Sequence, residues 1–214
     1  MKKGRGFGIM KIFNNKKMKT FLFIDSTNLY AAQFELFGPE RYLDFPSFIK
    51  EIEDKIKIKF DKIYFYASYS PQSKKPTKKE KLYLKNEALF YRSVKSTKNL
   101  VFSTGYRSKT SGKEKEVDVK LAVDIVDFGH RNYYQNIFLL TGDADFLQAL
   151  FSMKKIDKKI SVVCLENKVM YRAAFYFLTY VLKLSKKEVK FNFIKFQKYK
   201  IINLEKDNLL KNIT

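Results

Sequence analysis

Short apolar runs alternate with segments of helical periodicity along most of the chain. Residues 21–25 (FLFID) form an apolar run that ends in a carboxylate, a pattern typical of a strand buried on both faces. Residues 45–60 carry a proline in their first turn and isoleucines at helical spacing, which predicts a helix. The same criteria predict further strands at 62–69, 100–105, 137–140 and 160–165, and helices at 29–37, 82–94, 117–128, 145–153 and 169–184.

Strands that alternate with helices predict an α/β fold with a mostly parallel central sheet and helices on both faces. A length of 214 residues fits one such domain with short extensions. We expect a basic N-terminal extension at 1–18, the folded domain at 19–184 and a basic C-terminal extension at 185–214. The sequence leaves open whether the last segment docks as an edge strand.

Aspartates follow two of the predicted strands. In open parallel sheets, ligands bind outside the carboxyl ends of the strands, and Asp25 and Asp143 each lie at such an end. If the two strands are neighbours, a spacing of about 4.8 Å brings the carboxylates close together. Asp118, in the first turn of helix 117–128, and Asp145, two residues beyond Asp143, can reach the same crevice.

Carboxylates this close repel one another by roughly 4 kcal/mol per pair at about 4 Å and an effective dielectric near 20. A cation would offset that repulsion. With only His130 and Cys164 available as nitrogen and sulfur ligands, a zinc site is excluded, whereas an all-oxygen cluster suits Mg²⁺ or Mn²⁺. Such a metal activates water and stabilises charge on a phosphate in transfer.

The excess of basic residues points to a polyanionic partner. The formal charge is 43 − 22 = +21, which produces a field that attracts nucleic acid, although a bias in overall composition explains part of it. Basic residues gather in two predicted connections, where they either contact phosphates or are simply solvated. The candidates for nucleic-acid binding are Lys74, Lys75, Lys78, Lys79, Arg107, Lys109, Lys113 and Lys115. The neighbouring Tyr69 and Tyr106 either stack on bases or pack against the domain.

The apolar run at 21–24 is shorter than the apolar core of a signal peptide, which has roughly 7 to 15 residues, and no run reaches the roughly 18 residues of a membrane span. We therefore expect a cytoplasmic protein with no membrane segment. A single cysteine excludes a disulfide framework. The oligomeric state, monomer or homodimer, stays open.

Three blocks of sequence together resemble a known family. FIDSTNLY at 23–30, EKEVDVKLAVDIV at 114–126 and LLTGDADFLQAL at 139–150 are similar, in order and spacing, to the signature blocks of the NYN domain, a branch of the PIN-like nuclease superfamily. The resemblance covers residues 19–184. It implies a Rossmann-like PIN fold, dependence on Mg²⁺ or Mn²⁺, and endonuclease action that is usually directed at RNA.

Carried over by position, the resemblance implies that four acids bind metal and carry catalysis: Asp25, Asp118, Asp143 and Asp145. Asn28 matches the asparagine that supports the metal site, and Asp124 matches an acid that we expect to have a supporting or structural role.

The chain departs from the family pattern at three positions. Ser26 and Glu116 stand where glycine is frequent, and Thr141 stands where serine is frequent. Thr141 still offers a hydroxyl to water or phosphate, and Glu116 adds negative charge beside the site. None of the departures removes an expected ligand.

The function that these features predict is a metal-dependent endoribonuclease, which hydrolyses phosphodiester bonds with a Mg²⁺- or Mn²⁺-activated water held by the aspartate cluster. Two alternatives stay open: a module that binds RNA without cutting it, and a nuclease directed at DNA. A phosphatase of the haloacid dehalogenase kind is disfavoured because Thr27 stands where those enzymes need a second aspartate.

Overall fold

Strands and helices alternate in the structure, a computed structural model that describes residues 18–37, 41–107, 114–165, 195–196 and 210–212. The strands are β1 (Thr20–Asp25), β2 (Arg41–Leu43), β3 (Lys62–Ala67), β4 (Leu100–Thr104), β5 (Tyr106–Arg107), β6 (Glu114–Lys115), β7 (Asn136–Leu140), β8 (Lys159–Leu165), β9 (Lys195–Phe196) and β10 (Leu210–Asn212). The helices are α1 (Ser26–Phe37), α2 (Phe45–Ile56), α3 (Lys78–Lys95), α4 (Val117–His130), the 3₁₀ turn η1 (Ala144–Phe146) and α5 (Leu147–Lys155).

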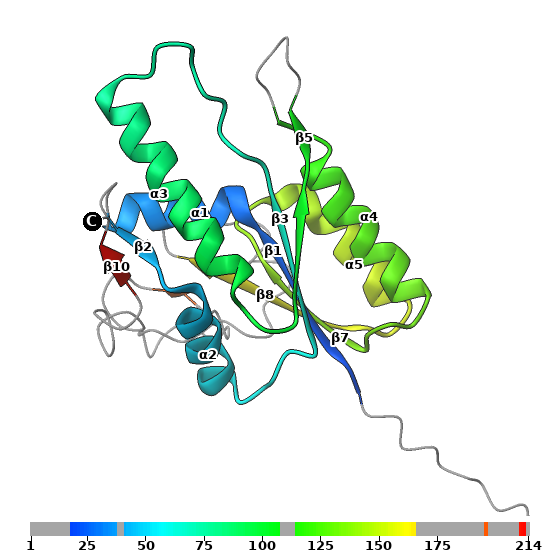
Figure 1. The fold of residues 1–214 in the computed structure, drawn as a ribbon. Coiled ribbons are helices and arrows are strands. Elements are labelled where there is room, and N and C mark those ends of the chain that lie inside the picture. Colours follow the sequence, from blue (N-terminus) through cyan, green and yellow to red (C-terminus); the bar gives the residue numbers. More distant parts are fainter. Residues whose placement is uncertain (1–17, 38–40, 108–113, 166–194, 197–209, 213–214) are drawn as a thin grey trace, which may run out of the picture.

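The central sheet has the strand order β4-β3-β1-β7-β8-β9, and each neighbouring pair is parallel. Strand β1 lies in the middle, with Asp25 opposite Tyr66 of β3 and Ile24 opposite Leu140 of β7 (Figure 1). The predicted α/β fold with a parallel sheet is therefore confirmed. The two strands that lead to Asp25 and Asp143 are neighbours, which is the condition under which we expect their carboxylates to lie close together.

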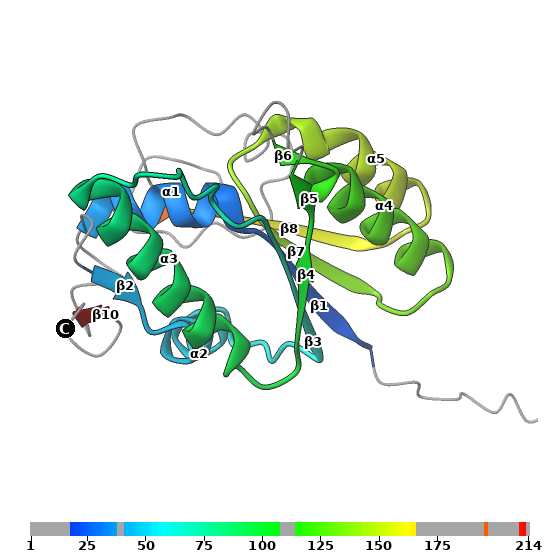
Figure 2. The ribbon, with the colours of Figure 1, turned by 45° about the horizontal axis from the view of Figure 1, so that its top comes forward.

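Helices cover both faces of the sheet. Figure 2 shows α1, α2 and α3 on one side and α4 and α5 on the other. On β1, Leu22 and Ile24 pack into the cluster under the first group of helices, while Phe21 and Phe23 pack into the cluster under the second. All six residues of β1 are buried, which explains why the sequence shows an unbroken apolar run there.

Two helices begin earlier than their periodicity predicts. α1 begins at Ser26, where we expected residue 29, because the Asp25 carboxylate accepts the Asn28 backbone N–H as an N-cap does. α3 begins at Lys78, where we expected residue 82. Thr77 and Glu80 form a capping box there, each side chain accepting the other's backbone N–H.

The remaining differences concern short elements. The helix expected over 45–60 ends at Ile56, since Lys57 takes a left-handed conformation with φ of 55° and the chain turns toward β3. β2, β5, β6, β9 and β10 span two or three residues each, too few for a periodic signal. The helix expected at 169–184 lies outside the described residues.

Two strands lie beyond the expected domain boundary at 184. β9 pairs with the end of β8, and β10 pairs antiparallel with β2, with Leu210 opposite Leu43. Over these few residues, the C-terminal extension therefore adds an edge strand to the sheet and a second short ladder beside α1 and α3. None of the helices in the described ranges is long and apolar enough to cross a membrane.

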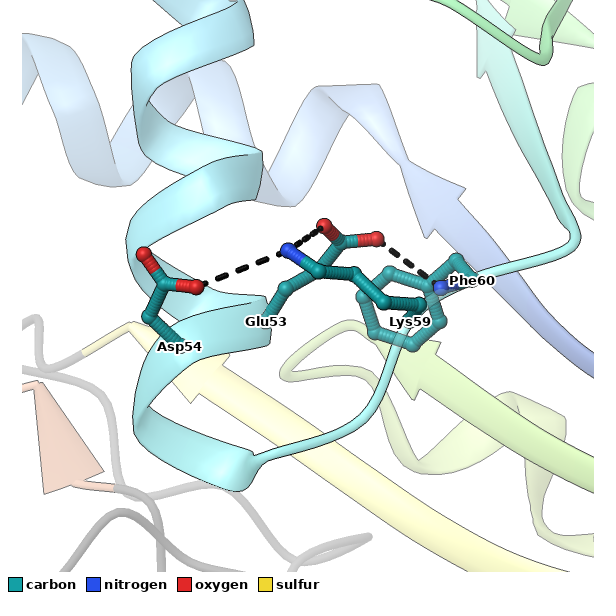
Figure 3. Close-up of polar contacts among 4 residues, drawn as sticks. All are labelled: Glu53, Asp54, Lys59 and Phe60. Carbon is teal, nitrogen blue, oxygen red and sulfur yellow. Dashed lines mark hydrogen bonds and ion pairs between the residues drawn. The ribbon is translucent and has the colours of Figure 1, made fainter.

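The connection from α2 to β3 is held by one carboxylate. Glu53 accepts the backbone N–H of Phe60 at 2.8 Å through one oxygen and pairs with the Lys59 ammonium at 2.8 Å through the other (Figure 3). Asp54 makes only a longer contact, 3.5 Å, to the same ammonium, and its side chain is more exposed. Glu53 therefore fixes the point at which the chain enters β3 and buries Phe60.

We predict that Glu53→Ala lowers the free energy of unfolding by about 1–2 kcal/mol, because the half-buried Phe60 N–H loses its acceptor. Asp54→Ala is the matched control on the same helix and should leave stability nearly unchanged, as exposed ion pairs contribute little. Urea denaturation of the two variants measures the difference. Equal losses would show that the Phe60 hydrogen bond does not matter.

Candidate active site

The expected acids gather at the carboxyl edge of the sheet. Asp25 is the last residue of β1, and the neighbouring β7 is followed directly by Thr141, Gly142 and Asp143. Asp118 lies in the first turn of α4, which packs on β1 and β3. The parallel topology thus brings segments far apart in sequence to one end of the molecule.

Asp25 is the buried member of this group, with 5% of its surface exposed. Its carboxylate accepts the Thr141 hydroxyl at 2.8 Å and the Asn28 backbone N–H at 3.2 Å. Burial raises the pKa of Asp25 to about 6; the two hydrogen bonds oppose this rise, and the negative charges of Asp118 and Asp143 add to it. All three acids therefore lie within electrostatic reach of one another around Asp25.

Thr141 connects Asp25 to the loop that carries the other acids. Its fully buried hydroxyl donates to Asp25 and accepts the Asp143 backbone N–H at 3.0 Å. Asp143 in turn accepts the Asp145 backbone N–H at 2.9 Å and so caps η1. Asp143 is half-buried and Asp145 is exposed, so they face progressively more solvent than Asp25.

Close backbone packing places Asp118. A Cβ on Gly105, just after β4, would lie 1.8 Å from Val117 Cγ2, so only glycine allows α4 to begin this close to the sheet. Glu116, before the helix, has φ of 79°, a conformation that glycine adopts readily and other residues adopt at a cost of about 1–2 kcal/mol. The left-handed turn explains why glycine suits this position in the family pattern. Asp118 itself is exposed at the start of α4.

Asp124, two turns further along α4, has a different set of contacts. It accepts the Tyr66 hydroxyl at 2.8 Å and pairs with the Lys120 ammonium at 2.9 Å. Tyr66 is buried and lies opposite Asp25 in the β1–β3 register. Asp124 therefore ties α4 to the sheet beside Asp25, which suits the supporting role expected for it.

The oxygen atoms around Asp25 fit a hard divalent cation in chemical type. Beside the carboxylates, Ser26 Oγ and Asn28 Oδ1 are buried and have no hydrogen-bond partner among the described residues, and buried polar atoms are rarely left so. Within the part of the chain that the structure describes, however, no three His, Cys, Asp or Glu side chains are arranged to hold a metal ion. The acids share an electrostatic environment; they do not form a closed ligand set.

The predicted basic residues divide into two groups. Lys74, Lys75, Lys78 and Lys79 are exposed, in the β3–α3 connection and the first turn of α3. Arg107 and Lys115 lie in the β5–β6 ladder, whereas Lys109 and Lys113 fall outside the described residues. Figure 1 shows that the β3–α3 connection and β5 leave the sheet at the edge where α1 begins. The connection that carries Lys74 and Lys75 therefore begins at the edge that carries the acids.

Tyr69, at the start of that connection, packs on the domain while one side stays open. Its ring lies edge-on to Tyr91 at 5.2 Å, its hydroxyl accepts from the Lys95 ammonium at 2.9 Å, and 45% of its surface is exposed.

Three contributors to this edge were not anticipated: Ser26, Tyr66 and Glu87, a buried carboxylate on α3 that holds the start of the β3–α3 connection. Ser26 was noted only as a departure from glycine. Tyr66 belongs to an alternating strand sequence that predicts burial but no partner, and Glu87 lies in a helix of mixed polarity whose inner face the sequence does not mark.

We predict that Asp25→Asn stabilises the metal-free protein at neutral pH. Because the folded-state pKa of about 6 lies above the ordinary value of 3.8, the folded state binds more protons between those values, and stability falls as pH rises from about 4 to about 6. The asparagine variant carries no such charge. Its advantage should be absent near pH 4 and reach about 1–3 kcal/mol above pH 7, measured by urea denaturation in EDTA. A difference independent of pH would contradict this account.

Comparison with known proteins gives the family. The NYN domain matches residues 19–181. Among solved structures, the crystal structure of a protein of unknown function from Vibrio parahaemolyticus is similar, with a TM-score of 0.50 and 17% sequence identity over 71% of this chain and 83% of that one; it supports the fold alone. The search of curated proteins found no match. Since the family match spans most of the chain and falls on the segments that form the acidic edge, the chain belongs to the NYN domain family, within the PIN-like nuclease superfamily.

Proposed function

We propose that the protein is a metal-dependent endoribonuclease. NYN domains are generally nucleases, and nucleases of this superfamily typically use divalent metals. The observation that carries the proposal is the buried Asp25 carboxylate, whose pKa is raised in part by the charges of Asp118 and Asp143 at the same sheet edge. A carboxylate with a perturbed pKa, grouped with other acids at the carboxyl ends of parallel strands, is typical of a functional site.

The residues of the edge would have different roles according to how deeply they are buried. Asp25 would be the inner ligand of Mg²⁺ or Mn²⁺, held in place by Thr141 and the start of α1. Asp118, Asp143 and Asp145 would complete the oxygen set from the solvent side, with Asn28 as support. A divalent cation bound there would lower the pKa of a water molecule and offset the negative charge that develops on a phosphodiester.

The hydrogen bonds to Asp25 have a definite effect on this chemistry. Both the Thr141 hydroxyl and the Asn28 N–H favour the ionised carboxylate and so limit the rise of its pKa. With a pKa of about 6, Asp25 is mostly ionised at neutral pH and can act as a ligand. Tyr66 and Asp124 would keep α4, and therefore Asp118, against the sheet.

RNA is the proposed substrate. A net charge of +21 favours a polyanion, and exposed lysines lie along the connection that leaves the sheet at the acidic edge and in the first turn of α3. We assign phosphate contact to Lys74, Lys75, Lys78 and Lys79, and extend it to Arg107, Lys109, Lys113 and Lys115 on the strength of their place in the sequence.

The decisive experiment is a cleavage assay with total RNA, single-stranded DNA and duplex DNA in Mg²⁺, Mn²⁺ or EDTA. We predict metal-dependent cleavage of RNA. The cleavage rate of Asp143→Asn should fall at least about 100-fold, because the variant lacks a charged metal ligand that the catalytic step requires. Asp127→Asn, which removes an acid paired with Arg131 far along α4, is the control and should retain activity.

Two results would change the assignment. Near-full activity of Asp143→Asn would remove the acidic edge from the mechanism. Binding of RNA without cleavage in any metal would favour the non-catalytic binding module, and preferential cleavage of DNA would favour the DNA-directed nuclease.

We also predict a strong salt dependence of RNA binding in EDTA. For single strands, the slope of log affinity against log salt is about −0.7 per neutralised phosphate, so contact with about four phosphates gives a slope near −3. Fluorescence anisotropy across a salt series measures it. A flat response would show that the basic surface does not contact the nucleic acid.

A further inference from the structure

A small pocket lies between the β3–α3 connection and the first turns of α3. It is lined by Ser70, Pro71, Lys79, Glu80, Tyr83 and Leu84. The lining is mostly apolar and carries one cation and one carboxylate. The expected metal ligands take no part in it.

One lining residue, Ser70, is held in place by a buried carboxylate. Glu87, with 4% of its surface exposed, accepts the Ser70 hydroxyl at 2.6 Å and the Ser70 backbone N–H at 3.0 Å. Ser70 is the point at which the chain leaves the core for the lysine-rich connection. A buried charge satisfied by one residue of a loop holds that residue in a single position.

Other residues that line the pocket, Glu80 and Tyr83, are also held in place by contacts within the domain. The capping box formed by Thr77 and Glu80 holds the end of the connection against α3. The Tyr83 ring packs edge-on against Tyr30 at 5.3 Å, and the Tyr30 hydroxyl donates to Asn86 at 3.0 Å. Tyr30 lies five residues after Asp25 on α1, about 7 Å along the helix axis. The pocket is therefore formed in advance of any ligand, and Tyr30 connects its wall to the helix that follows Asp25.

We propose that this pocket binds one unpaired nucleobase of the nucleic acid that the acidic edge acts on, which makes the protein selective for single strands. The inference rests on the proposed function for the identity of the ligand as nucleic acid. Tyr83, Pro71 and Leu84 offer apolar surface to the base, and stacking on such surfaces is tolerant of sequence. A base inside a duplex is paired and stacked, so it does not enter a pocket of this kind.

Charge selects a nucleotide over an uncharged apolar ligand. Lys79 lines the pocket, while Lys74 and Lys75 on the adjoining connection and Lys78 in the first turn of α3 are exposed and available to the phosphates on either side of the base. Glu80 is held ionised, since hydrogen bonds from Thr77 lower its pKa. Its carboxylate can accept from the exocyclic amino group of cytosine.

Binding measurements in EDTA test the pocket independently of catalysis. Labelled single-stranded RNA, a strand of equal length and charge without bases, and an RNA duplex are compared by fluorescence anisotropy. We expect the wild type to bind the base-containing strand about tenfold more tightly than the strand without bases, the effect of roughly one stacked base. The duplex should show no such gain over the strand without bases.

Matched variants locate the effect. Leu84→Ala, in the pocket, should reduce the preference for bases several-fold, whereas Leu82→Ala, half-buried on the same helix but outside the lining, should keep it. Lys79→Gln should weaken binding of the base-containing strand more than Lys78→Gln, although each removes one charge from the same turn. Circular dichroism confirms that each variant is folded.

The inference is overturned if the wild type binds both single strands equally, if the duplex binds as tightly as the base-containing strand, or if the paired variants behave alike. If metal-dependent cleavage occurs but bases are not preferred, the role proposed for the pocket is wrong and the proposed nuclease function stands. If bases are preferred but no metal supports cleavage, the role proposed for the pocket stands and the proposed nuclease function is wrong.

Discussion

Burial of the Asp25 carboxylate beside two other acids is the constraint on which the site depends. A charge in the protein interior is unfavourable unless hydrogen bonds or an opposite charge compensate it. Here the compensation comes from a hydroxyl on the neighbouring strand end and an amide at the start of α1, while Asp118 and Asp143 act against it. The protein thus keeps a carboxylate in an unfavourable state at the edge of its sheet, and structures retain such a cost mostly where function requires it.

The parallel sheet makes that arrangement stable. β1 is buried on both faces between two clusters of aromatic and aliphatic side chains, so its register with β3 and β7 is fixed by packing on either side. Asp25 therefore cannot move away from Thr141 without disturbing the core. The same register places Tyr66 beside Asp25, from which its hydroxyl reaches Asp124 on α4. The acids on loops and at helix starts are thus positioned relative to one rigid strand.

Much of this could be predicted from the sequence, because long apolar runs and helical periodicity report burial directly. The parallel sheet and the position of Asp25 at a strand end followed from those patterns. Its nearness to the Asp143 loop depended on the order of the strands in the sheet, which the patterns left open. The hydrogen-bond partners did not: Tyr66 to Asp124 and Ser70 to Glu87 join residues on different elements, and no local pattern records such pairs. Short strands such as β9 and β10 were also missed, since pairing with distant residues, and no periodicity of their own, defines them.

Acidic and basic side chains occupy different parts of the described site. Acids lie at the strand ends, and lysines lie on the connection that rises beside them. A polyanion attracted by the lysines would meet repulsion from uncompensated carboxylates, which a bound divalent cation would reverse. Within the proposed function, the metal would therefore act on binding as well as on chemistry, because it would make a repulsive part of the surface attractive to a polyanion. The pocket proposed for a base includes none of these acids in its lining, so affinity for an unpaired strand can be retained there without metal.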